Sequence, residues 1–139
     1  MIVVDTNIIG YLFLTSDRSS QVEDALRKDP DWVAPLLWRS EFRNVLAYYI
    51  RKKIFLLEDA NRIMEEAITL MQGHEYEIAS FRVLSLVANS TCSAYDCEFV
   101  ALAQDLRIPV VTVDKQILGQ FPEDAMSLDN FLKPINQDG

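Results

Sequence analysis

Histidine is almost absent from this sequence, which contains only His74. Paired-imidazole RNA cleavage within one chain and a histidine-rich zinc site are therefore excluded. The two cysteines, Cys92 and Cys97, fit no C-x-x-C pattern and are too few for a disulfide framework, so we expect reduced residues that pack in the interior. No G-x-G-x-x-G or G-x-x-x-x-G-K-S/T run is present, which removes the common dinucleotide and P-loop signatures.

A long apolar segment is also missing. No uncharged stretch is both long enough and apolar enough for a membrane span of about 20 residues. The first residues carry no basic region of the kind that opens a secretory signal, and their apolar run is broken by Asp5. We therefore expect a soluble, cytoplasmic protein with no membrane partner.

Positive charge is scarce. The chain has 13 Lys and Arg against 21 Asp and Glu, a formal net charge of −8 and a sequence pI of about 4.5. This balance argues against broad electrostatic adhesion to nucleic acid, because such adhesion depends on cations that displace phosphate counterions. An acidic protein can still act on phosphates through bound divalent cations.

The few cations are concentrated in one segment. Between residues 39 and 53 the single acid Glu41 is accompanied by Arg39, Arg43, Arg51, Lys52 and Lys53. For residues 51–53 two interpretations stay open: a solvated helix end whose cations are favoured by the helix dipole, or contact with phosphate. The nearby aromatic residues are candidates for a dimer interface or base stacking, but core packing is the default at helical spacing.

The chain has the size of one domain, since it contains 139 residues and half of them are hydrophobic. Buried, mainly apolar strands are predicted at residues 2–4 and 110–114, and further strands at residues 32–35 and 76–79. Helical patterns cover residues 7–14, 17–28, 36–53, 58–72, 81–88 and 95–106, with Ser16 or Asp17 capping the second helix and Gly73 closing the fourth. Strands that alternate with helices indicate an α/β fold with a mostly parallel sheet.

Two of these strands run directly into an aspartate, in "IVVD" and "VVTVD". Ligands of parallel α/β sheets bind beyond the carboxyl ends of the strands, so Asp5 and Asp114 are expected side by side at one edge. Asp5, Thr6 and Asn7 are all plausible N-cap residues for the next helix. We expect Thr6 or Asn7 to begin that helix, which leaves the Asp5 carboxylate free.

Helical geometry places two further acids. Glu41 falls on the shoulder of an apolar helix face, where it is either a boundary glutamate with its head in water or a site residue. Asp96 lies three residues after Ser93, a spacing typical of a capping box, and capping leaves one oxygen free for a metal. Glu98 lies on another flank of the same helix and is the weaker candidate, as an auxiliary ligand.

Convergence of these acids would require a cation. Four carboxylates at one site cannot all stay ionised at neutral pH without compensating positive charge. A hard, oxygen-loving ion such as Mg²⁺ or Mn²⁺ supplies it. Such an ion polarises a phosphoryl oxygen and lowers the pKa of a bound water, so the acids point to phosphodiester chemistry.

Three segments together resemble the PIN-domain family, and specifically its VapC-type ribonuclease toxins. They are "IVVDTNII", "WRSEFRNVL" with Glu41, and "SAYDCEFVALAQDLRIPVVTVD" with its final Asp114. The resemblance runs from residue 2 to about residue 132 with all landmarks in order. It implies a three-layer α/β/α fold with a central, mostly parallel sheet of four to five strands, built as a single PIN domain over residues 1–132 with a C-terminal tail at 133–139.

Proteins similar to this are Mg²⁺- or Mn²⁺-dependent endoribonucleases. The resemblance therefore implies hydrolysis of phosphodiester bonds in structured RNA such as tRNA or rRNA. It also implies a homodimer and a small VapB-like antitoxin whose C-terminal segment enters the active site. The chain would then be the toxin component of a type II toxin-antitoxin system.

The resemblance also implies a set of site residues. The acidic catalytic residues are Asp5, Glu41, Asp96 and Asp114, with Asn7 and Thr112 as supporting polar groups near the metal. We hypothesise that Asp5, Asp96 and Asp114 hold the metal directly or through water. Glu41 completes the site and orients the attacking water.

Arg39 and Arg43 are candidates for holding the substrate backbone. They lie one helical turn apart near Glu41, and arginine binds phosphate in a bidentate manner.

Three alternatives compete with this interpretation. The first is a PIN nuclease with another task, such as a stand-alone RNA-processing enzyme or a structure-specific DNA nuclease. The second is a phosphorylation-controlled, non-catalytic metal-binding signalling domain, but "WVAP" offers no phosphate-accepting aspartate and Asp5 is not followed by a second acid. The third is a binding protein whose acids are structural caps.

Overall fold

The structure is a computed structural model that describes residues 1–134. Its elements in chain order are β1 (Ile2–Val4), α1 (Thr6–Phe13), α2 (Ser19–Lys28), β2 (Trp32–Pro35), α3 (Trp38–Arg51), α4 (Leu57–Met71), β3 (Glu75–Tyr76), α5 (Ser80–Ala88), α6 (Ala94–Leu106), β4 (Val110–Thr112), α7 (Lys115–Gln120), β5 (Ala125–Ser127) and α8 (Leu128–Leu132). The alternation of strands and helices predicted from the sequence is confirmed.

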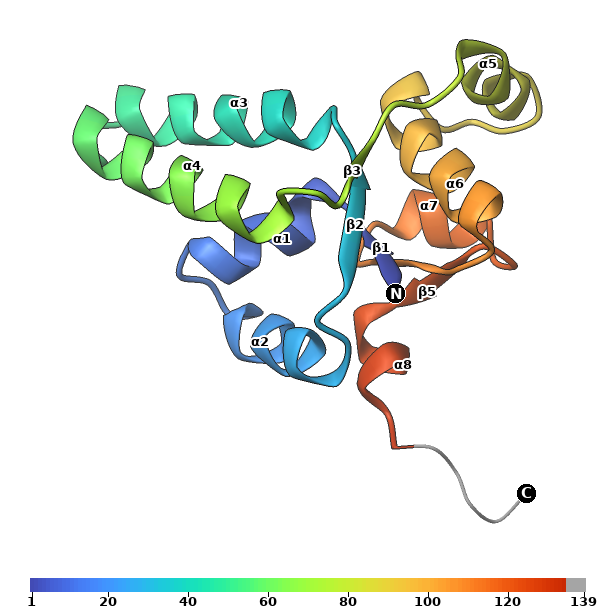
Figure 1. The fold of residues 1–139 in the computed structure, drawn as a ribbon, viewed down its shortest axis with the longest axis horizontal. Coiled ribbons are helices and arrows are strands. Elements are labelled where there is room, and N and C mark those ends of the chain that lie inside the picture. The colour runs from blue at the N-terminus through green and yellow to red at the C-terminus, as the bar shows by residue number, and fades with distance from the viewer. Residues whose placement is uncertain (135–139) are drawn as a thin grey trace.

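All five strands pair in parallel in one sheet of order β3-β2-β1-β4-β5. Helices α1–α4 lie on one side of the sheet and α5–α7 on the other, which gives three layers (Figure 1). β1 occupies the centre because its three residues are entirely apolar, and both faces of a parallel strand must be covered. The predicted α/β/α architecture with four to five strands is therefore confirmed.

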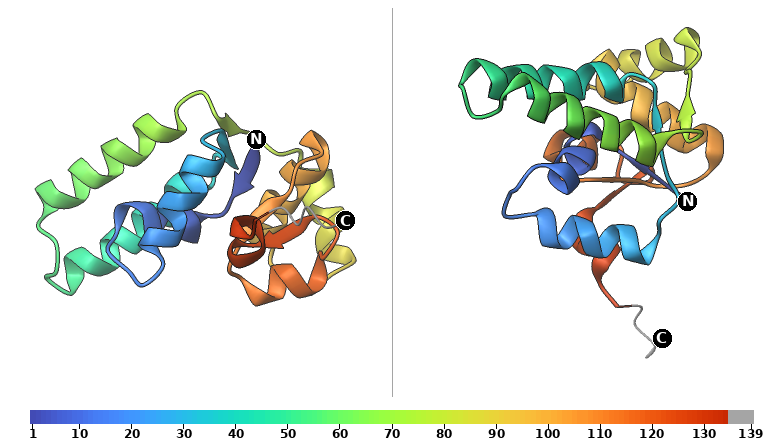
Figure 2. Two further views of the ribbon diagram at one scale, coloured as in Figure 1. Left: turned by 90° about the horizontal axis from the view of Figure 1, so that it is seen from below. Right: turned by 60° about the vertical axis from the view of Figure 1, so that its left-hand side comes forward.

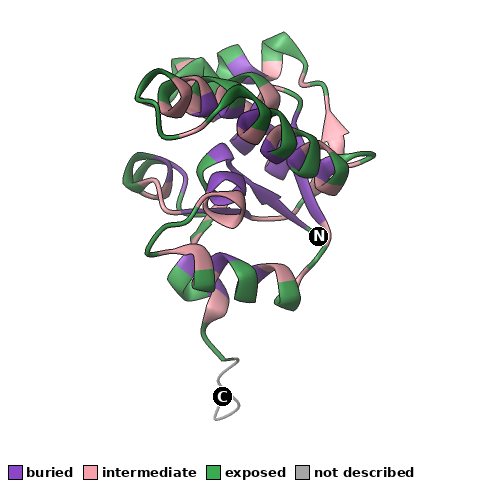
Figure 3. Cartoon of the chain, turned by 90° about the vertical axis from the view of Figure 1, so that its left-hand side faces the viewer, coloured by how far each residue is buried: buried purple, intermediate pink, exposed green. Residues whose placement is uncertain are grey.

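The core is continuous across the sheet. The central strands are buried, and the outer faces of the helices are exposed (Figure 3). The largest fully buried side chains include Trp32, Trp38 and Phe42, which join β2 and α3 to this core. A smaller cluster under α5 and α7 contains Cys92 and Cys97, both buried and unpaired, as expected.

Helices α3 and α4 form a hairpin whose closed end projects away from the sheet (Figures 1 and 2). α3 runs from its first turn beside the sheet to a basic, solvent-exposed C-terminal end at residues 51–53. This arrangement matters for the site, because residues at the first turn of α3 lie near the carboxyl ends of the strands.

Several predicted boundaries are wrong. The strand predicted at 76–79 is the two-residue β3, and the strand predicted at 110–114 stops at Thr112, because Asp114 caps a helix. Neither Ser16 nor Asp17 caps α2, which begins at Ser19 after Arg18. Gly73 does follow α4, with a φ of 82° that glycine adopts without steric cost. Elements α7, β5 and α8 were not predicted.

No helix within residues 1–134 is long and apolar enough to cross a membrane. The single domain over residues 1–132 stays a prediction, and most of the expected tail, residues 135–139, lies outside the described residues.

Candidate active site

Asp5 lies at the carboxyl end of β1 and caps α1. Its Oδ1 accepts a hydrogen bond of 3.0 Å from the backbone N–H of Ile8, and its Oδ2 accepts one from the hydroxyl of Thr112. The side chain is buried. α1 does begin at Thr6, as expected, but the expectation that this leaves the Asp5 carboxylate free is wrong, because Asp5 is the N-cap and satisfies an unpaired N–H of the first turn.

The buried position of Asp5 changes its acidity. Desolvation by burial raises the pKa of its carboxyl to about 6, although the hydrogen bonds from Thr112 and Ile8 act in the opposite direction. The negative charges of Asp114 and Asp96 raise the pKa further. Asp5 is thus a carboxylate in a site that disfavours negative charge unless a cation is present.

Asp114 follows β4 by two residues and caps α7. Its Oδ1 accepts hydrogen bonds from the N–H groups of Gln116 at 2.8 Å and Ile117 at 3.1 Å. The hydroxyl of Thr112 accepts a hydrogen bond of 2.9 Å from the Asp114 N–H. Oδ2 of Asp114 has no hydrogen-bond donor within residues 1–134, so this oxygen is available to a ligand.

Glu41 enters the site from the first turn of α3. It is half-buried, and its Oε1 accepts a hydrogen bond of 2.7 Å from the hydroxyl of Thr6. Burial raises the pKa of the Glu41 carboxyl, the Thr6 bond lowers it, and the charge of Asp96 raises it again. The carboxylate of Glu41 is therefore held at the pocket by Thr6 and is not free in water.

Asp96 enters from the first turn of α6. Its backbone N–H donates a hydrogen bond of 3.1 Å to Oγ of Ser93, which is the N-cap of the helix. The capping box is thus formed on one side only, because among the described residues the Asp96 carboxylate makes no bond back to Ser93. Burial and the charge of Asp114 raise the pKa of the Asp96 carboxyl.

The four acids meet in one small pocket of about 70 Å³. It is lined by Asp5, Thr6, Asn7, Glu41, Asp96, Phe99 and Asp114. The pocket lies beyond the carboxyl ends of β1 and β4, at the N-terminal ends of α3 and α6. The charges of Asp114 and Asp96 raise the pKa of Asp5, and the charge of Asp114 raises that of Asp96. The charge of Asp96 also raises the pKa of Glu41, so these carboxylates lie close enough to repel.

A divalent cation fits this donor set by its chemistry. Within residues 1–134 no three His, Cys, Asp or Glu side chains lie close enough together to hold a metal ion as they stand. Mg²⁺ does not require such a cage, because it keeps several waters and is held by one or two carboxylates. The pocket offers carboxylate and amide oxygens, the ligands that Mg²⁺ and Mn²⁺ prefer.

The remaining expected residues are placed differently. Asn7 is exposed and lines the pocket, and Thr112 is fully buried beneath it. Glu98 lies outside the acidic pocket and lines a separate hollow with Val83 and Leu84. Burial and the charge of Glu41 raise the pKa of its carboxyl.

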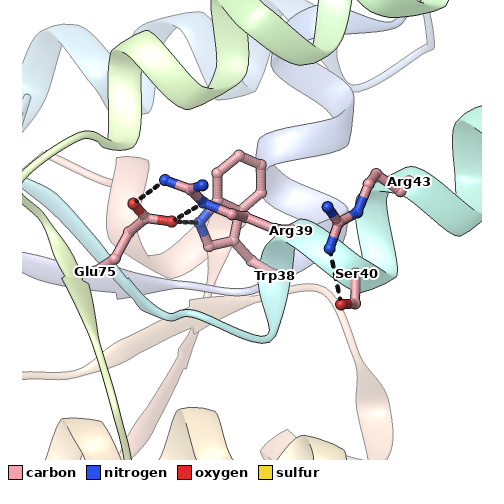
Figure 4. Close-up of polar contacts among 5 residues, drawn as sticks. All are labelled: Trp38, Arg39, Ser40, Arg43 and Glu75. Atoms are coloured by element: carbon pink, nitrogen blue, oxygen red, sulfur yellow. Dashed lines mark hydrogen bonds and ion pairs between the residues drawn. The ribbon is translucent and has the colours of Figure 1, made fainter.

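Arg39 and Arg43 do not line the acidic pocket. The guanidinium of Arg39 donates two hydrogen bonds to Glu75, at 2.6 and 2.7 Å, and the indole N–H of Trp38 donates a third at 2.8 Å (Figure 4). Arg43 is exposed and donates a hydrogen bond of 3.1 Å to Ser40. Arg39 thus ties α3 to β3, and a role in substrate binding stays a prediction for both arginines.

The sequence did not predict the contacts of three side chains that shape the pocket or hold α3 in place. Thr6 was considered only as a cap, although its hydroxyl holds Glu41. Phe99 walls the pocket from α6, and Glu75 fixes the start of α3 through Arg39. Thr6 is adjacent to Asp5, which was the one available signal. The other two depend on how distant segments pack.

The fold and the pocket define an α/β protein with an acidic site at the carboxyl edge of a parallel sheet. The chain belongs to the PIN-domain family, whose sequence model matches residues 2–121. The resemblance drawn from the three sequence segments is thereby confirmed.

Individual relatives agree with this assignment. The chain is 26% identical over 124 residues to "Ribonuclease VapC3" of Pyrobaculum aerophilum, covering 87% of this chain and 95% of that protein. A "Toxin-antitoxin complex from Klebsiella pneumoniae" contains a chain with a TM-score of 0.69 at 17% identity, covering 92% of this chain and 98% of that one. The "Structure of FitAB bound to IR36 DNA fragment" also has a TM-score of 0.69, at 19% identity, covering 98% and 100%.

Proposed function

We propose that this protein is a metal-dependent endoribonuclease and the toxin component of a VapBC-like toxin-antitoxin system. The observation that carries the proposal is the meeting of Asp5, Glu41, Asp96 and Asp114 in one pocket at the carboxyl edge of the sheet. The relative named as a ribonuclease and the neighbour titled as a toxin-antitoxin complex support the same class.

The proposed metal ligands are Asp5, Asp96 and Asp114, with Mg²⁺ as the ion and Mn²⁺ as a substitute. When bound, such an ion polarises a phosphoryl oxygen, lowers the pKa of a bound water and relieves the repulsion between the carboxylates. Asp114 offers its uncapped Oδ2, whereas Thr112 orients Asp5 through its hydroxyl.

Glu41 is proposed to orient the attacking water. Its carboxylate is fixed by the Thr6 hydroxyl through Oε1, so Oε2 is the oxygen left to accept a hydrogen bond from water. A raised pKa brings a carboxyl closer to the range in which it exchanges a proton near neutral pH. Asn7, at the exposed rim of the pocket, is a supporting polar contact for the metal or the substrate.

The products distinguish two mechanisms. In-line attack by water on phosphorus leaves a 5′-phosphate and a 3′-hydroxyl. Attack by the 2′-hydroxyl of the RNA would leave a 2′,3′-cyclic phosphate, which contradicts the proposal. Chemical mapping of the RNA ends after cleavage decides between them.

The proposed substrate is structured RNA, such as tRNA or rRNA, cut in single-stranded or loop regions in the cytoplasm. The test is incubation of the purified protein with RNA and with DNA in Mg²⁺, in Mn²⁺ and in EDTA. We expect cleavage of RNA in either metal and none in EDTA. Cleavage that survives EDTA, or that persists in both Asp5→Asn and Asp96→Asn, contradicts the metal mechanism, and a preference for DNA contradicts the substrate.

The proposed partners are a VapB-like antitoxin and a second copy of the chain. The neighbour titled as a toxin-antitoxin complex supports the first. Light scattering of the isolated protein tests the homodimer. Co-purification with the product of an adjacent small reading frame, together with loss of RNA cleavage in the complex, tests the antitoxin.

A further inference from the structure

An open hollow of about 420 Å³ lies on the part of α3 that is far from the acidic pocket, and the roles proposed above make no use of it. It is lined by Asn44, Tyr48, Arg51 and Lys52. An amide, an aromatic ring and two cations therefore share one depression on the C-terminal half of α3.

This hollow lies on the same side of α3 as Glu41. At about 100° per residue, Tyr48 and Lys52 are each only about 20° from Glu41 around the helix axis. By the same geometry Arg39 and Arg43 are about 160° away, which agrees with their absence from the acidic pocket. A strand of nucleic acid that leaves the acidic pocket along the Glu41 side of α3 therefore reaches the hollow. It does not reach Arg39 or Arg43, which lie on the opposite side of the helix.

The spacing suits a short stretch of RNA. Tyr48 is seven residues beyond Glu41, which corresponds to a rise of about 10 Å along the helix. A stacked strand advances about 3.4 Å per nucleotide, so the hollow lies about three nucleotides from the pocket.

The side chains of the hollow suit an unpaired nucleotide. Tyr48 is 56% exposed, and the Lys52 ammonium lies 5.6 Å from the centre of its ring. The ring of Tyr49 meets Tyr48 edge-on, with 5.6 Å between ring centres. An exposed aromatic ring beside cations is the combination that binds single strands, through base stacking and phosphate contact, and the Asn44 amide can donate to or accept from a base edge.

The helix dipole alone does not explain this cluster. The dipole accounts for the cations at the C-terminal end of α3, but it gives no reason for the exposed ring of Tyr48 one turn earlier. The nearby aromatic residue Phe55, by comparison, packs against the core. Four other arginines (Arg27, Arg39, Arg62 and Arg82) pair with carboxylates. Arg51 and Lys52 make no ion pair within residues 1–134, so their charge is available to an anion in an otherwise acidic chain.

We propose that Asn44, Tyr48, Arg51 and Lys52 form a nucleotide subsite for single-stranded RNA, about three nucleotides from the cleaved bond. The proposal rests on the nuclease function proposed above. It gives the substrate a second point of attachment, in which Tyr48 stacks on a base and the two cations contact phosphates.

The test is a binding measurement in a chain that cannot cleave. Fluorescence anisotropy is recorded for a labelled, mixed-sequence RNA strand of about 12 nucleotides with the Asp5→Asn protein. Adding Tyr48→Ala is expected to weaken binding about tenfold, and Tyr48→Phe to preserve it, because the ring and not the hydroxyl stacks. Neither change is expected to weaken binding of an RNA duplex, whose bases are already stacked.

The charges are tested by salt dependence. Arg51→Gln combined with Lys52→Gln is expected to reduce the slope of log affinity against log salt by about 1.4, or about 0.7 for each phosphate that the protein no longer neutralises. The matched control is Arg27→Gln combined with Arg62→Gln, which removes the same charge from exposed positions on α2 and α4. This control is expected to leave the slope unchanged.

Three outcomes overturn the subsite. The first is that the Tyr48→Ala protein binds the single strand as tightly as the Asp5→Asn protein does. The second is that Tyr48→Ala weakens binding of duplex RNA as much as binding of the single strand. The third is that the Arg27→Gln and Arg62→Gln control changes the salt slope as much as the Arg51→Gln and Lys52→Gln variant does. Unchanged RNA binding would assign the hollow to a protein partner instead. RNA cleavage by the chain with native Asp5 is measured in parallel: its absence contradicts the proposed function, whereas cleavage with unchanged binding contradicts the subsite alone. Thermal unfolding of each variant checks that it is folded.

Discussion

Thr112 at the end of β4 donates a hydrogen bond to Asp5 at the end of β1, across 107 positions of the chain. The bond exists because the two strands pair in parallel with Val4 opposite Val111, which brings the next residues face to face. The same hydroxyl accepts a hydrogen bond from the N–H of Asp114. One fully buried threonine therefore orients two of the four acids of the site.

Replacement of Thr112 by valine keeps the shape of the side chain and removes both hydrogen bonds. We expect the free energy of unfolding to fall by about 1 to 3 kcal/mol, because the buried Asp5 carboxylate loses a donor and the Asp114 N–H loses its acceptor. RNA cleavage is expected to fall as well, since both acids lose their orientation. Urea unfolding and the rate of cleavage measure the two effects.

The control is Thr112→Ser, which retains the hydroxyl. It is expected to recover most of the cleavage rate even if the lost methyl group lowers stability. Equal cleavage by the valine and wild-type proteins would show that the hydroxyl does not position the site.

The central part of the fold was predictable because its strands are short, almost entirely apolar segments. β1, β2 and β4 are buried at every position, so their sequences show no alternation of apolar and polar residues. By contrast, α7 has six residues and β5 has three, too few for a periodic pattern to develop. β5 is placed by pairing with β4 and packing against α8, and α7 is placed by packing against β5, and not by local sequence.

The site was predictable where it depends on strand ends and not where it depends on packing. Asp5 and Asp114 follow strands, and parallel pairing alone brings them to one edge. The bond from Thr6 to Glu41 requires α1 to lie against α3, and the pairing of Arg39 with Glu75 requires β3 to follow β2 at the sheet edge. No spacing in the sequence encodes either contact.

Asp5→Asn is expected to stabilise the metal-free protein at pH 8 while abolishing cleavage. Burial raises the pKa of Asp5 from 3.8 to about 6. Between these two pH values the folded state holds a proton on Asp5 that the unfolded state has lost. Stability therefore falls as the pH rises from about 4 to 6 and stays low above that range. A neutral asparagine escapes this penalty and should add about 1 to 3 kcal/mol at pH 8.

Unfolding of both proteins in EDTA across the pH range checks this sign. The two stabilities are expected to converge below about pH 4, where aspartate is protonated in both states. A constant difference at every pH would mean that asparagine acts through packing or hydrogen bonding and not through charge.

Mg²⁺ is expected to raise the stability of the wild-type protein. An ion that binds only the folded state adds about 2.7 kcal/mol at 100 times its dissociation constant. This gain in stability should be lost in the Asp96→Asn protein. It should be kept in the Glu66→Gln protein, the matched control, which loses one carboxylate at an exposed position on α4. Melting temperatures over a Mg²⁺ titration measure it, and equal shifts in all three proteins would indicate unspecific binding.

Glu75→Gln tests the link between β3 and α3 through its pH dependence. The two hydrogen bonds from Arg39 lower the pKa of the Glu75 carboxyl below its usual 4.5, so its ionised form stabilises the fold. That contribution is fully present above the unfolded pKa and is lost as the pH falls through the folded pKa. We expect Glu75→Gln to cost about 1 to 3 kcal/mol at pH 7 and progressively less below pH 4.5. Denaturant unfolding at both pH values measures the difference. If Glu75→Gln costs the same stability below pH 4.5 as at pH 7, the cost does not come from the ion pair with Arg39. It would then come from packing or from a weakened bond to the Trp38 indole N–H, although a glutamine oxygen can also accept that bond.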